Sequence, residues 1–509
     1  MHDTNMSTAP GTVRRKIYQL VIGRLDGDNI GDPSYEEKIR AFVQKGIGGF
    51  IIFGGTREAV RSFLLTLRPG ADIPLFIAAD IERGLGQQIR GTTLFPSQMA
   101  MAAAFDIRNP EGEILFDRAV KEIARESKTV GINMPLIPVL DVNQNPDNPI
   151  ICTRAFSDNP ETVALFGSCA IKILEREGLF SCAKHFPGHG DTAVDSHISL
   201  PEIRKSPEEF MAVDLLPFQH AVSADVSSIM IGHLSAPVFD DRPASLSRTV
   251  VTGLLRGKLG FEGLIMTDAL NMHALKGYGD VPVQCLNAGV DILLHPPDPD
   301  LTVGEVVRAI EAGDISERQI DNAVSRILRH KKRIKEHAEP DVEYSGNEEF
   351  ATRIFEMSIT LVKDTPGVLP LSQKDKVSVL FCGDASFFPE SPLRNFCGKA
   401  SVLSRTDELQ GHVHNEVAVF AIFTSVAAWK GSSGISEEEL SLIRKLSAQA
   451  RHSVVLSFGS PYVLRHFKEA DILIAAYDVS AQAQHAVIRC LEGRRGFQGR
   501  LPIRLIFGQ

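Results

Sequence analysis

The sequence predicts an α/β protein in which a (β/α)8 TIM-like barrel is followed by a smaller α/β sandwich domain. Over the first two-thirds of the 509 residues, short continuous apolar runs alternate with longer amphipathic stretches. Continuous apolar runs are typical of parallel strands that are buried on both faces of a sheet. A polar stretch then interrupts this pattern, and the pattern starts again in the last third of the chain.

Eight apolar runs are candidates for the strands of the barrel, because eight β-then-α units over about 320 residues fit this fold. A doubly wound open sheet is the alternative, since periodicity alone does not separate the two folds. We expect the barrel at residues 1–338, a linker at 339–348 and the second domain at 349–509. The eight runs are residues 17–22, 50–53, 75–79, 136–140, 179–183, 228–231, 264–266 and 292–294.

Helix signals agree with this division. Ser316 to Gln319 form a capping box, and the apolar stripe that follows predicts a helix ending in the basic run 330–333, which we interpret as solvated. In the second domain, the stretch 436–450 opens with Ser-Glu-Glu-Glu and also has helical periodicity. Buried strands are predicted there at residues 377–381, 418–423, 454–458 and 472–476.

Composition narrows the class of protein. Hydrophobic residues make up 43% of the chain and charged residues 23%, which is ordinary for a globular protein and excludes disorder of the whole chain. The net charge of -9 argues against a nucleic-acid partner, whose phosphates require basic residues. No apolar run approaches the roughly 20 residues that span a bilayer, so no membrane association is expected.

The N-terminal segment and the cysteines indicate a cellular compartment. The first residues are polar and do not follow the plan of a signal peptide. Seven cysteines are scattered along the chain, their number is odd, and no CxxC pair occurs. Free thiols in a reducing compartment are the simplest interpretation. We therefore expect a cytoplasmic protein.

The densest cluster of polar side chains lies at residues 184–197, directly after the apolar run 179–183. It contains three His, two Asp and one Lys. In a barrel of parallel strands, the residues just past the carboxyl end of a strand line the active-site face. Pro187 and two glycines make the segment a loop. The cluster is therefore the main candidate for the active site.

Further charged residues follow other predicted strands. Asp268 comes directly after the run 264–266, where it is either a group at the barrel mouth or a helix N-cap. Asp80 and Glu82 follow another run in the same way, and Arg90 lies just beyond them. Arg154 lies in the loop after the fourth run.

Two chemistries fit these residues. The first is metal-assisted hydrolysis, with zinc ligands drawn from His185, His189, Asp191, Asp195 and His197. A His pair at this spacing binds metal mainly on a helix, and the Pro-Gly step between the first two histidines breaks any helix, so we expect no metal. The second is glycoside hydrolysis with retention, in which Asp268 is the nucleophile and His197 the proton donor held by Asp195.

The segment 184–197 resembles the signature of glycoside hydrolase family 3. Its Asp-Ser-His ending is similar to that of bacterial β-N-acetylglucosaminidases of the NagZ type, in which a His–Asp dyad replaces the carboxylic acid of the family's β-glucosidases. The resemblance implies that His197 is the general acid/base and Asp195 its partner. The Met-Thr-Asp string that ends at Asp268 matches the nucleophile motif of the family.

Other segments support the resemblance. Asp80-Ile81-Glu82 resembles the Asp-x-Glu motif of the family, although Arg83 stands where a Gly is common. Strings in the last third, among them Ala475-Ala476-Tyr477-Asp478, resemble the C-terminal domain of two-domain members. The resemblance implies that the sugar is bound by Asp80, Arg90, Arg154, Lys184 and His185.

The implied reaction is the removal of a terminal β-linked N-acetylglucosamine from peptidoglycan fragments (muropeptides) during cell-wall recycling, without a cofactor. The substrate is the only implied partner, and the oligomeric state stays open. An N-acetylglucosaminide phosphorylase and a β-glucosidase are the alternatives within the family. From other classes, a metal-dependent hydrolase and a non-catalytic sugar-binding protein stay open.

Overall fold

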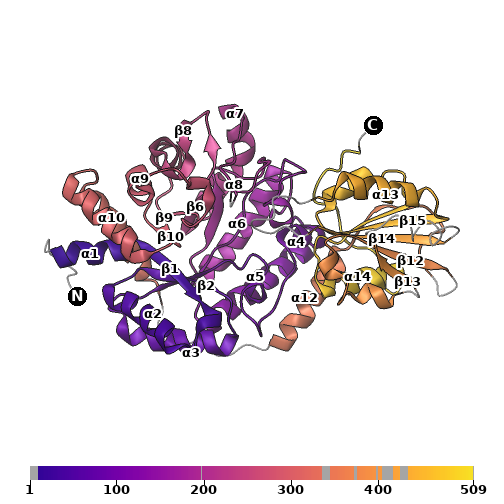
Figure 1. The fold of residues 1–509 in the computed structure, drawn as a ribbon, viewed down its shortest axis with the longest axis horizontal. Coiled ribbons are helices and arrows are strands. Elements are labelled where there is room, and N and C mark those ends of the chain that lie inside the picture. The colour runs from indigo at the N-terminus through magenta and orange to yellow at the C-terminus, as the bar shows by residue number, and fades with distance from the viewer. Residues whose placement is uncertain are drawn as a thin grey trace.

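Parallel strands form a ring in the N-terminal part of the molecule, as the computed structural model shows (Figure 1). The structure describes residues 10–196, 198–334, 344–371, 375–396, 399–403, 416–424 and 434–507. The strands of the ring are β1 (Val21–Asp26), β2 (Gly49–Phe53), β3 (Phe76–Ala79), β4 (Met134–Pro135), β5 (Cys182–Phe186), β6 (Ser228–Ile231), β9 (Leu264–Thr267) and β10 (Leu293–Leu294), and β7 (Ser235–Ala236) and β8 (Asp240–Pro243) form a separate two-stranded sheet.

The ring is closed by two bridges between two sheets. One sheet has the order β10-β1-β2-β3-β4 and the other the order β5-β6-β9. A parallel bridge between Val139 and Lys184 joins them on one side, and a bridge between Met266 and Ile292 joins them on the other. Because an open sheet would keep two free edges, this closure confirms the barrel over the doubly wound alternative.

Helices surround the ring, and most begin where the sequence supplies a cap. The side chains of Asp32, Thr56, Asn109, Asn159 and Asp298 accept hydrogen bonds from the first turns of their helices. The helices are α1 (Pro10–Gln19), α2 (Pro33–Lys45), α3 (Arg57–Leu67), α4 (Gln98–Ala104), α5 (Pro110–Val130), α6 (Pro160–Arg176), α7 (Pro207–Glu209), α8 (Leu216–Ser223), a π-helix (Thr249–Lys258), α9 (Val281–Ala288), α10 (Pro299–Ala312) and α11 (Glu317–Lys331). The predicted capping box of Ser316 and Gln319 is present at α11.

Three local predictions were wrong. The run 136–140 was expected to be the fourth strand, but the fourth strand is β4 at Met134–Pro135, just before this run. The run 17–22 was expected to be a strand, but α1 extends to Gln19 and β1 begins only at Val21. Ile17 and Tyr18 are buried on this helix, and a short run of buried residues looks the same on a helix as on a strand. The basic run 330–333 was expected to be solvated, but Lys331 is buried.

The second domain is a six-stranded sheet in its described part, with the order β11-β16-β15-β14-β12-β13. Only β11 is antiparallel to its neighbour. Helix α13 (Glu437–Ser447) packs on one face and α14 (Ala481–Leu491) on the other, which is the predicted sandwich (Figure 1). The strands are β11 (Thr360–Lys363), β12 (Val377–Gly383), β13 (Lys399–Val402), β14 (Val417–Thr424), β15 (His452–Gly459) and β16 (Ile472–Ala475).

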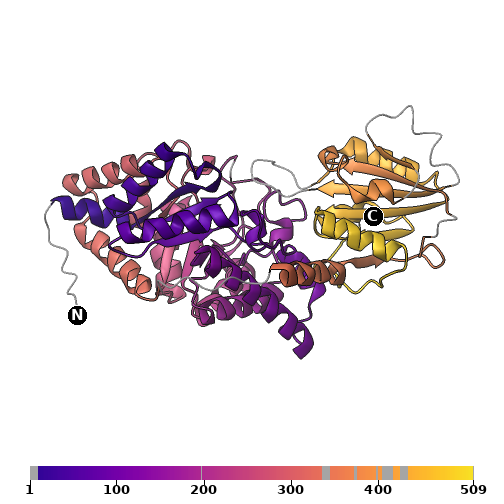
Figure 2. The same ribbon diagram turned by 90° about the horizontal axis from the view of Figure 1, so that it is seen from below.

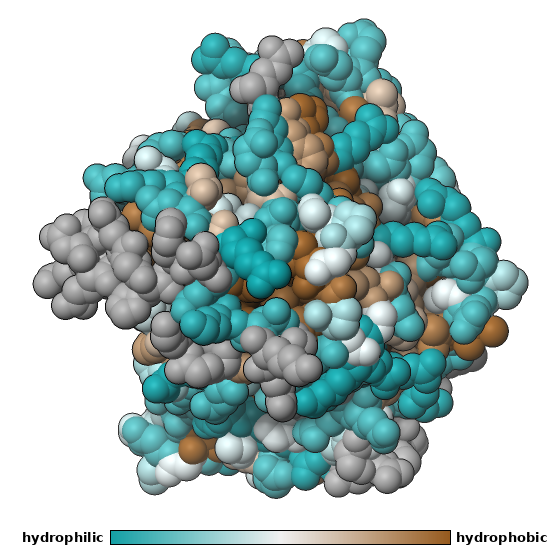
Figure 3. Space-filling view, turned by 90° about the vertical axis from the view of Figure 1, so that its right-hand side faces the viewer, coloured by the Kyte–Doolittle hydropathy of each residue, from teal (hydrophilic) through white to brown (hydrophobic). Residues whose placement is uncertain are grey.

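The four predicted strands of this domain and its helix at 436–450 are confirmed, whereas β11 and β13 were not predicted. On the end of the molecule that this domain forms, hydrophilic side chains are interspersed with smaller apolar areas (Figure 3). This is the expected surface of a sheet whose apolar faces are already covered by helices.

The two domains are joined by α12 (Tyr344–Ser358), which lies between the barrel and the second sheet (Figures 1 and 2). Of the predicted linker 339–348, residues 339–343 lie outside the described residues, and the rest already belongs to α12. Helix α4 of the barrel contributes to the apolar core of the second domain through Met99, Ala100 and Ala103. The two domains therefore share a buried apolar interface.

Two observations concern the expected cell compartment, which stays a prediction. Among the described helices, none has both the length and the apolar character that crossing a membrane requires. The described cysteines are all free thiols, and Cys397 lies outside the described residues.

Lys331 is an unusual group because it is a buried lysine held mainly by neutral acceptors. Its Nζ donates hydrogen bonds to the carbonyl oxygen of Gly48, at 2.7 Å, and to Oε1 of Gln19, at 3.0 Å. It also lies 5.0 Å from the centre of the Phe76 ring. Burial lowers its pKa from 10.5 to about 7, because the charged form loses its hydration.

We expect Lys331→Met to change how stability depends on pH. Between pH 7 and 10.5 the unfolded wild-type chain binds more protons at this group than the folded chain does, so the free energy of unfolding should rise with pH. The rise is at most about 1.4 kcal/mol per pH unit, and the variant should lack it. Denaturant unfolding at several pH values in this range measures the difference. Lys276→Met, which removes an exposed lysine, is the control; an equal pH dependence in both variants would contradict the prediction.

Candidate active site

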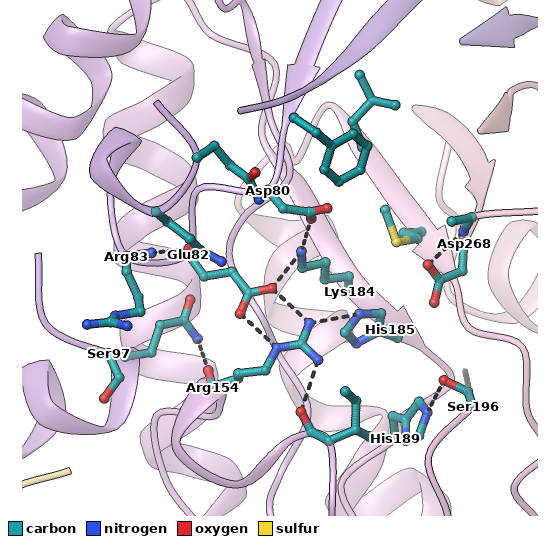
Figure 4. A pocket seen from close by; sticks show the side chains of 18 of the residues that line it. Asp80, Glu82, Arg83, Ser97, Arg154, Lys184, His185, His189, Ser196 and Asp268 are labelled. Atoms are coloured by element: carbon teal, nitrogen blue, oxygen red, sulfur yellow. Dashed lines mark hydrogen bonds and ion pairs between the residues drawn. The ribbon is translucent and has the colours of Figure 1, made fainter. Parts of the chain in front are cut away.

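A cavity of about 500 Å³ opens at the carboxyl ends of the barrel strands. Asp80 follows β3, Lys184 and His185 belong to β5, and Asp268 follows β9, so the strands themselves bring these side chains together (Figure 4). Asp478 and its neighbours from the second domain complete the wall. A cavity at this face is the expected place for the active site of a barrel enzyme.

A network of charged side chains, of which Lys184 and Glu82 are buried, lies along one side of the cavity (Figure 4). Nζ of Lys184 lies 2.7 Å from Oδ1 of Asp80 and 2.8 Å from Oε1 of Glu82. Nε and Nη2 of Arg154 each donate a hydrogen bond of 2.8 Å to the two carboxylate oxygens of Glu82. This bidentate pairing fixes the guanidinium plane as well as its charge.

The network sets the charge of its members. Burial alone would raise the pKa of Glu82, but Arg154 and Lys184 outweigh it and hold this pKa well below its usual range. Burial alone would lower the pKa of Lys184, but the carboxylates of Asp80 and Glu82 raise it instead. Each charge is thus stabilised only while its partners stay in place.

His185 is oriented by a buried carboxylate. Its Nδ1 lies 2.7 Å from Oδ2 of Asp141, and its Nε2 lies 3.4 Å from Nη2 of Arg154. Because a guanidinium can only donate, Nε2 must act as the acceptor, which leaves the proton on Nδ1 facing Asp141. Burial would raise the pKa of Asp141, but His185 and His189 lower it. His185 is therefore a fixed imidazole inside the network.

His189 holds the loop that follows β5. Its Nδ1 lies 2.8 Å from Oγ1 of Thr192, and its Nε2 lies 3.1 Å from Oγ of Ser196. Burial lowers the pKa of His189 to about 4, so the ring is neutral at ordinary pH. Asp195, next to Ser196, is buried, and His197 lies outside the described residues. The described part of the predicted dyad loop is thus anchored.

Asp268 comes from a separate strand, on the opposite side of the cavity from the Glu82 network (Figure 4). Its backbone N–H donates to the carbonyl oxygen of Ile231 in β6 at 2.9 Å, which fixes its place beyond β9. Its Oδ1 accepts a 2.7 Å hydrogen bond from the N–H of Ala269. A half-buried carboxylate is thus presented to the cavity from this side.

Of the predicted sugar contacts, the structure brings Asp80, Arg154, Lys184 and His185 to the cavity and leaves Arg90 outside. The backbone of Arg90 pairs with the loop after β2, through hydrogen bonds to Gly55 and Arg57, and its guanidinium lies 2.7 Å from Asp28. These contacts hold Arg90 away from the cavity.

Several residues of the site were not predicted. Glu82 stood in a recognised motif without a role, and Asp141, which directly follows the predicted run 136–140, was given none. Gln98 gave no signal, yet its Nε2 donates to the carbonyl oxygens of Arg154, at 2.7 Å, and Val139, at 3.0 Å. Arg83 and Asp478 also line the cavity.

The arrangement suits a polyhydroxylated ligand. Charged donors and acceptors alternate along one side of the cavity, and each can hydrogen-bond a hydroxyl group more strongly than a neutral partner can. The Asp268 carboxylate on the opposite side is available to stabilise or attack a cationic centre. Within the described residues, no three His, Cys, Asp or Glu side chains come together as a candidate metal site.

We expect Glu82→Gln to destabilise the protein by about 3–5 kcal/mol, because Arg154 would keep a buried charge without its carboxylate partner. Chemical denaturation at neutral pH measures this loss. Glu58→Gln removes an exposed carboxylate that also faces an arginine, and it should change stability far less, because water screens that pair. Equal effects of the two substitutions would show that the network does not hold the site.

Comparison with known proteins identifies the family. The family described as "Glycosyl hydrolase family 3 N terminal domain" matches residues 12–330. "Beta-hexosaminidase A" of Pseudoalteromonas piscicida is 27% identical over 90% of this chain and 89% of that protein. A "Beta-hexosaminidase" of Neisseria meningitidis serogroup C is 33% identical over 52% of this chain and 76% of that protein.

A solved structure has the same two-domain fold. It is a glycoside hydrolase family 3 β-N-acetylglucosaminidase from Paenibacillus sp. str. FPU-7, with a TM-score of 0.82 and 28% identity, and the match covers 97% of this chain and 99% of that one. These similarities agree with the resemblance to the NagZ type in segment 184–197. The chain therefore belongs to glycosyl hydrolase family 3 and is a glycoside hydrolase.

Proposed function

We propose that this chain is a retaining β-N-acetylglucosaminidase that removes terminal β-linked N-acetylglucosamine from peptidoglycan fragments. The observation that carries the proposal is the opposition of Asp268 to a buried network of charged hydrogen-bonding groups in one cavity. The names of the similar proteins point to the same sugar.

In this proposal Asp268 attacks the anomeric carbon and forms a covalent glycosyl ester while the glycosidic bond breaks. His197 gives its proton to the departing oxygen and then takes a proton from the water that hydrolyses the ester. Asp195 stabilises the protonated imidazole. The support is the Asp-Ser-His ending of the loop and the anchoring of its described part through His189.

The buried network would bind the hydroxyl groups of the sugar. Lys184 and Arg154 supply donors, and Asp80 supplies acceptor oxygens. The contact with Asp141 fixes the orientation of the His185 ring, so the ring would also meet the sugar in a fixed orientation. Because these groups are already placed by their contacts with each other, little reorganisation is needed when the sugar binds, which favours catalysis. The reaction needs only charge stabilisation and proton transfer, so we propose that no cofactor takes part.

The proposed natural substrates are N-acetylglucosaminyl-anhydro-muramyl peptides, encountered in the cytoplasm. The support is the resemblance of segment 184–197 to enzymes of the NagZ type. A phosphorylase would use the same glycosyl ester but pass the sugar to phosphate. Sugar-1-phosphate as the main product in phosphate buffer would replace the hydrolase proposal by this alternative.

We expect His197→Ala to lower kcat on nitrophenyl N-acetylglucosaminide by about 10²–10⁴-fold, because hydrolysis of the glycosyl ester loses the base that takes a proton from the attacking water. His220→Ala, an exposed histidine outside the cavity, is the control and should keep wild-type turnover. Near-wild-type turnover in the His197 variant would rule out the proposed dyad.

A covalent label should identify the nucleophile. A 2-fluoro sugar with a good leaving group should form the glycosyl ester and hydrolyse it slowly, so peptide mass mapping should place the adduct on Asp268. Asp268→Asn should neither form the adduct nor release nitrophenol, whereas Asp241→Asn, which changes an exposed carboxylate, should do both. An adduct on another residue would refute the assignment.

A further inference from the structure

An ion pair between the two domains lies at one end of the cavity. Nη2 of Arg83, in the loop after β3, lies 2.6 Å from Oδ2 of Asp478, which follows β16 in the second domain. Both residues line the cavity, and the Asp478 side chain is only 2% exposed. Figure 4 shows Arg83 on the far side of the Glu82 network from Asp268. The pair therefore closes the end opposite the proposed nucleophile.

Asp478 is held rigidly at this end. The preceding residue, Tyr477, has a φ of 60°, a left-handed conformation that is uncommon for a non-glycine residue and turns the chain here. The Tyr477 hydroxyl donates to Oγ1 of Thr360 at 2.8 Å, and its carbonyl oxygen accepts from Oγ of Ser97 in the barrel at 3.3 Å. Oδ1 of Asp478 accepts the N–H of Ser480 at 2.8 Å. Contacts to both domains thus fix the carboxylate.

Arg83 has hydrogen-bonding capacity that its surroundings do not use. Its backbone is fixed, because its N–H donates to Oε1 of Gln87 at 2.9 Å and its carbonyl oxygen accepts from Phe95 at 2.8 Å. Its Nε is buried and makes no hydrogen bond within the described part of the chain, whereas its Nη2 faces Oδ2 of Asp478 in the ion pair. Buried donors normally have partners. Because Arg83 lines the cavity, an Nε without a protein partner points to a ligand.

The charge balance of the pair indicates the kind of ligand. Asp478 offsets the charge of Arg83, so this end of the cavity presents donors and acceptors with little net charge. Such a surface suits hydroxyl groups better than a carboxylate or a phosphate, which would meet the repulsion of Asp478. A neutral sugar is the ligand that fits it.

We infer that Arg83 and Asp478 form the wall that meets the non-reducing end of the bound sugar and limits the pocket to one sugar residue. The inference rests on the proposed function, since Asp268 marks the end at which the glycosidic bond is cut. The opposite end must then face the hydroxyl groups farthest from that bond. The second domain thereby helps to determine that single terminal residues are removed, by supplying Asp478.

The double variant Arg83→Ala/Asp478→Ala tests the wall without leaving one buried charge unpaired. The substrates are the nitrophenyl glycosides of N-acetylglucosamine and of its β-1,4-linked disaccharide. The wild-type chain should cut the disaccharide substrate from its non-reducing end, so free nitrophenol should appear only after a lag. In the variant, KM for the monosaccharide substrate should rise about tenfold or more, while kcat changes less. Free disaccharide should also appear among its first products.

Arg465→Ala/Asp147→Ala is the matched control. This pair also joins the two domains, at 2.6 Å, but does not line the cavity, so KM and products should stay as in the wild type. An equal rise of KM in the control would mean that the Arg83 pair only holds the domains together, and would overturn the inference. An unchanged KM and unchanged first products in the Arg83 variant would also overturn it.

The conservative variant Asp478→Asn keeps the shape of the wall and covers the case in which the double variant does not fold. Its KM for the monosaccharide substrate should rise without release of free disaccharide, and an unchanged KM would overturn the inference. Failure of the proposed function would show in the wild-type chain, which would then release no N-acetylglucosamine from either substrate. If only the inference about the wall is wrong, the wild-type chain still releases N-acetylglucosamine from both substrates.

Discussion

The burial of Glu82 between two cations is the interaction on which the rest of the site depends. A carboxylate removed from water is stabilised only by partners at short distance, and Lys184 and Arg154 both lie 2.8 Å away. These partners come from β5 and from the loop before α6, whereas Glu82 follows β3. The charge requirement therefore fixes three separate segments of the barrel mouth relative to one another, and these segments line the cavity.

The carboxylates at the cavity differ in what surrounds them, and this difference indicates which of them could act as the nucleophile. Glu82 and Asp141 have lowered pKa values because cations or imidazoles surround them, and their oxygens are used in holding those groups. Asp268 comes from another strand and faces this assembly across the cavity (Figure 4). A nucleophile must keep an oxygen directed at the reacting carbon. This difference in position, rather than a difference in residue type, supports Asp268 for the role.

The sequence allowed the barrel to be predicted because its strands are buried on both faces and read as continuous apolar runs. The same criterion did not find β11 and β13, which contain lysine. These strands lie at the two edges of the second sheet, where burial is incomplete. Asp268 could be predicted because it directly follows its strand, whereas Lys184 was expected just past a strand and lies within β5. Arg90 could not be placed, since the path of a loop depends on contacts that the local sequence does not encode.

Contacts between the domains could not be predicted either, because they join segments that lie far apart in the sequence. These contacts connect the second domain to the cavity. Ser97 caps α4 and also donates to Tyr477, while the next residue, Gln98, holds the carbonyl oxygen of Arg154. The following residue, Met99, is buried in the core of the second domain. Three successive residues thus connect the packing of that domain to the guanidinium that pairs with Glu82. The free energy gained when the domains pack together therefore also stabilises the position of the Arg154 backbone at the cavity.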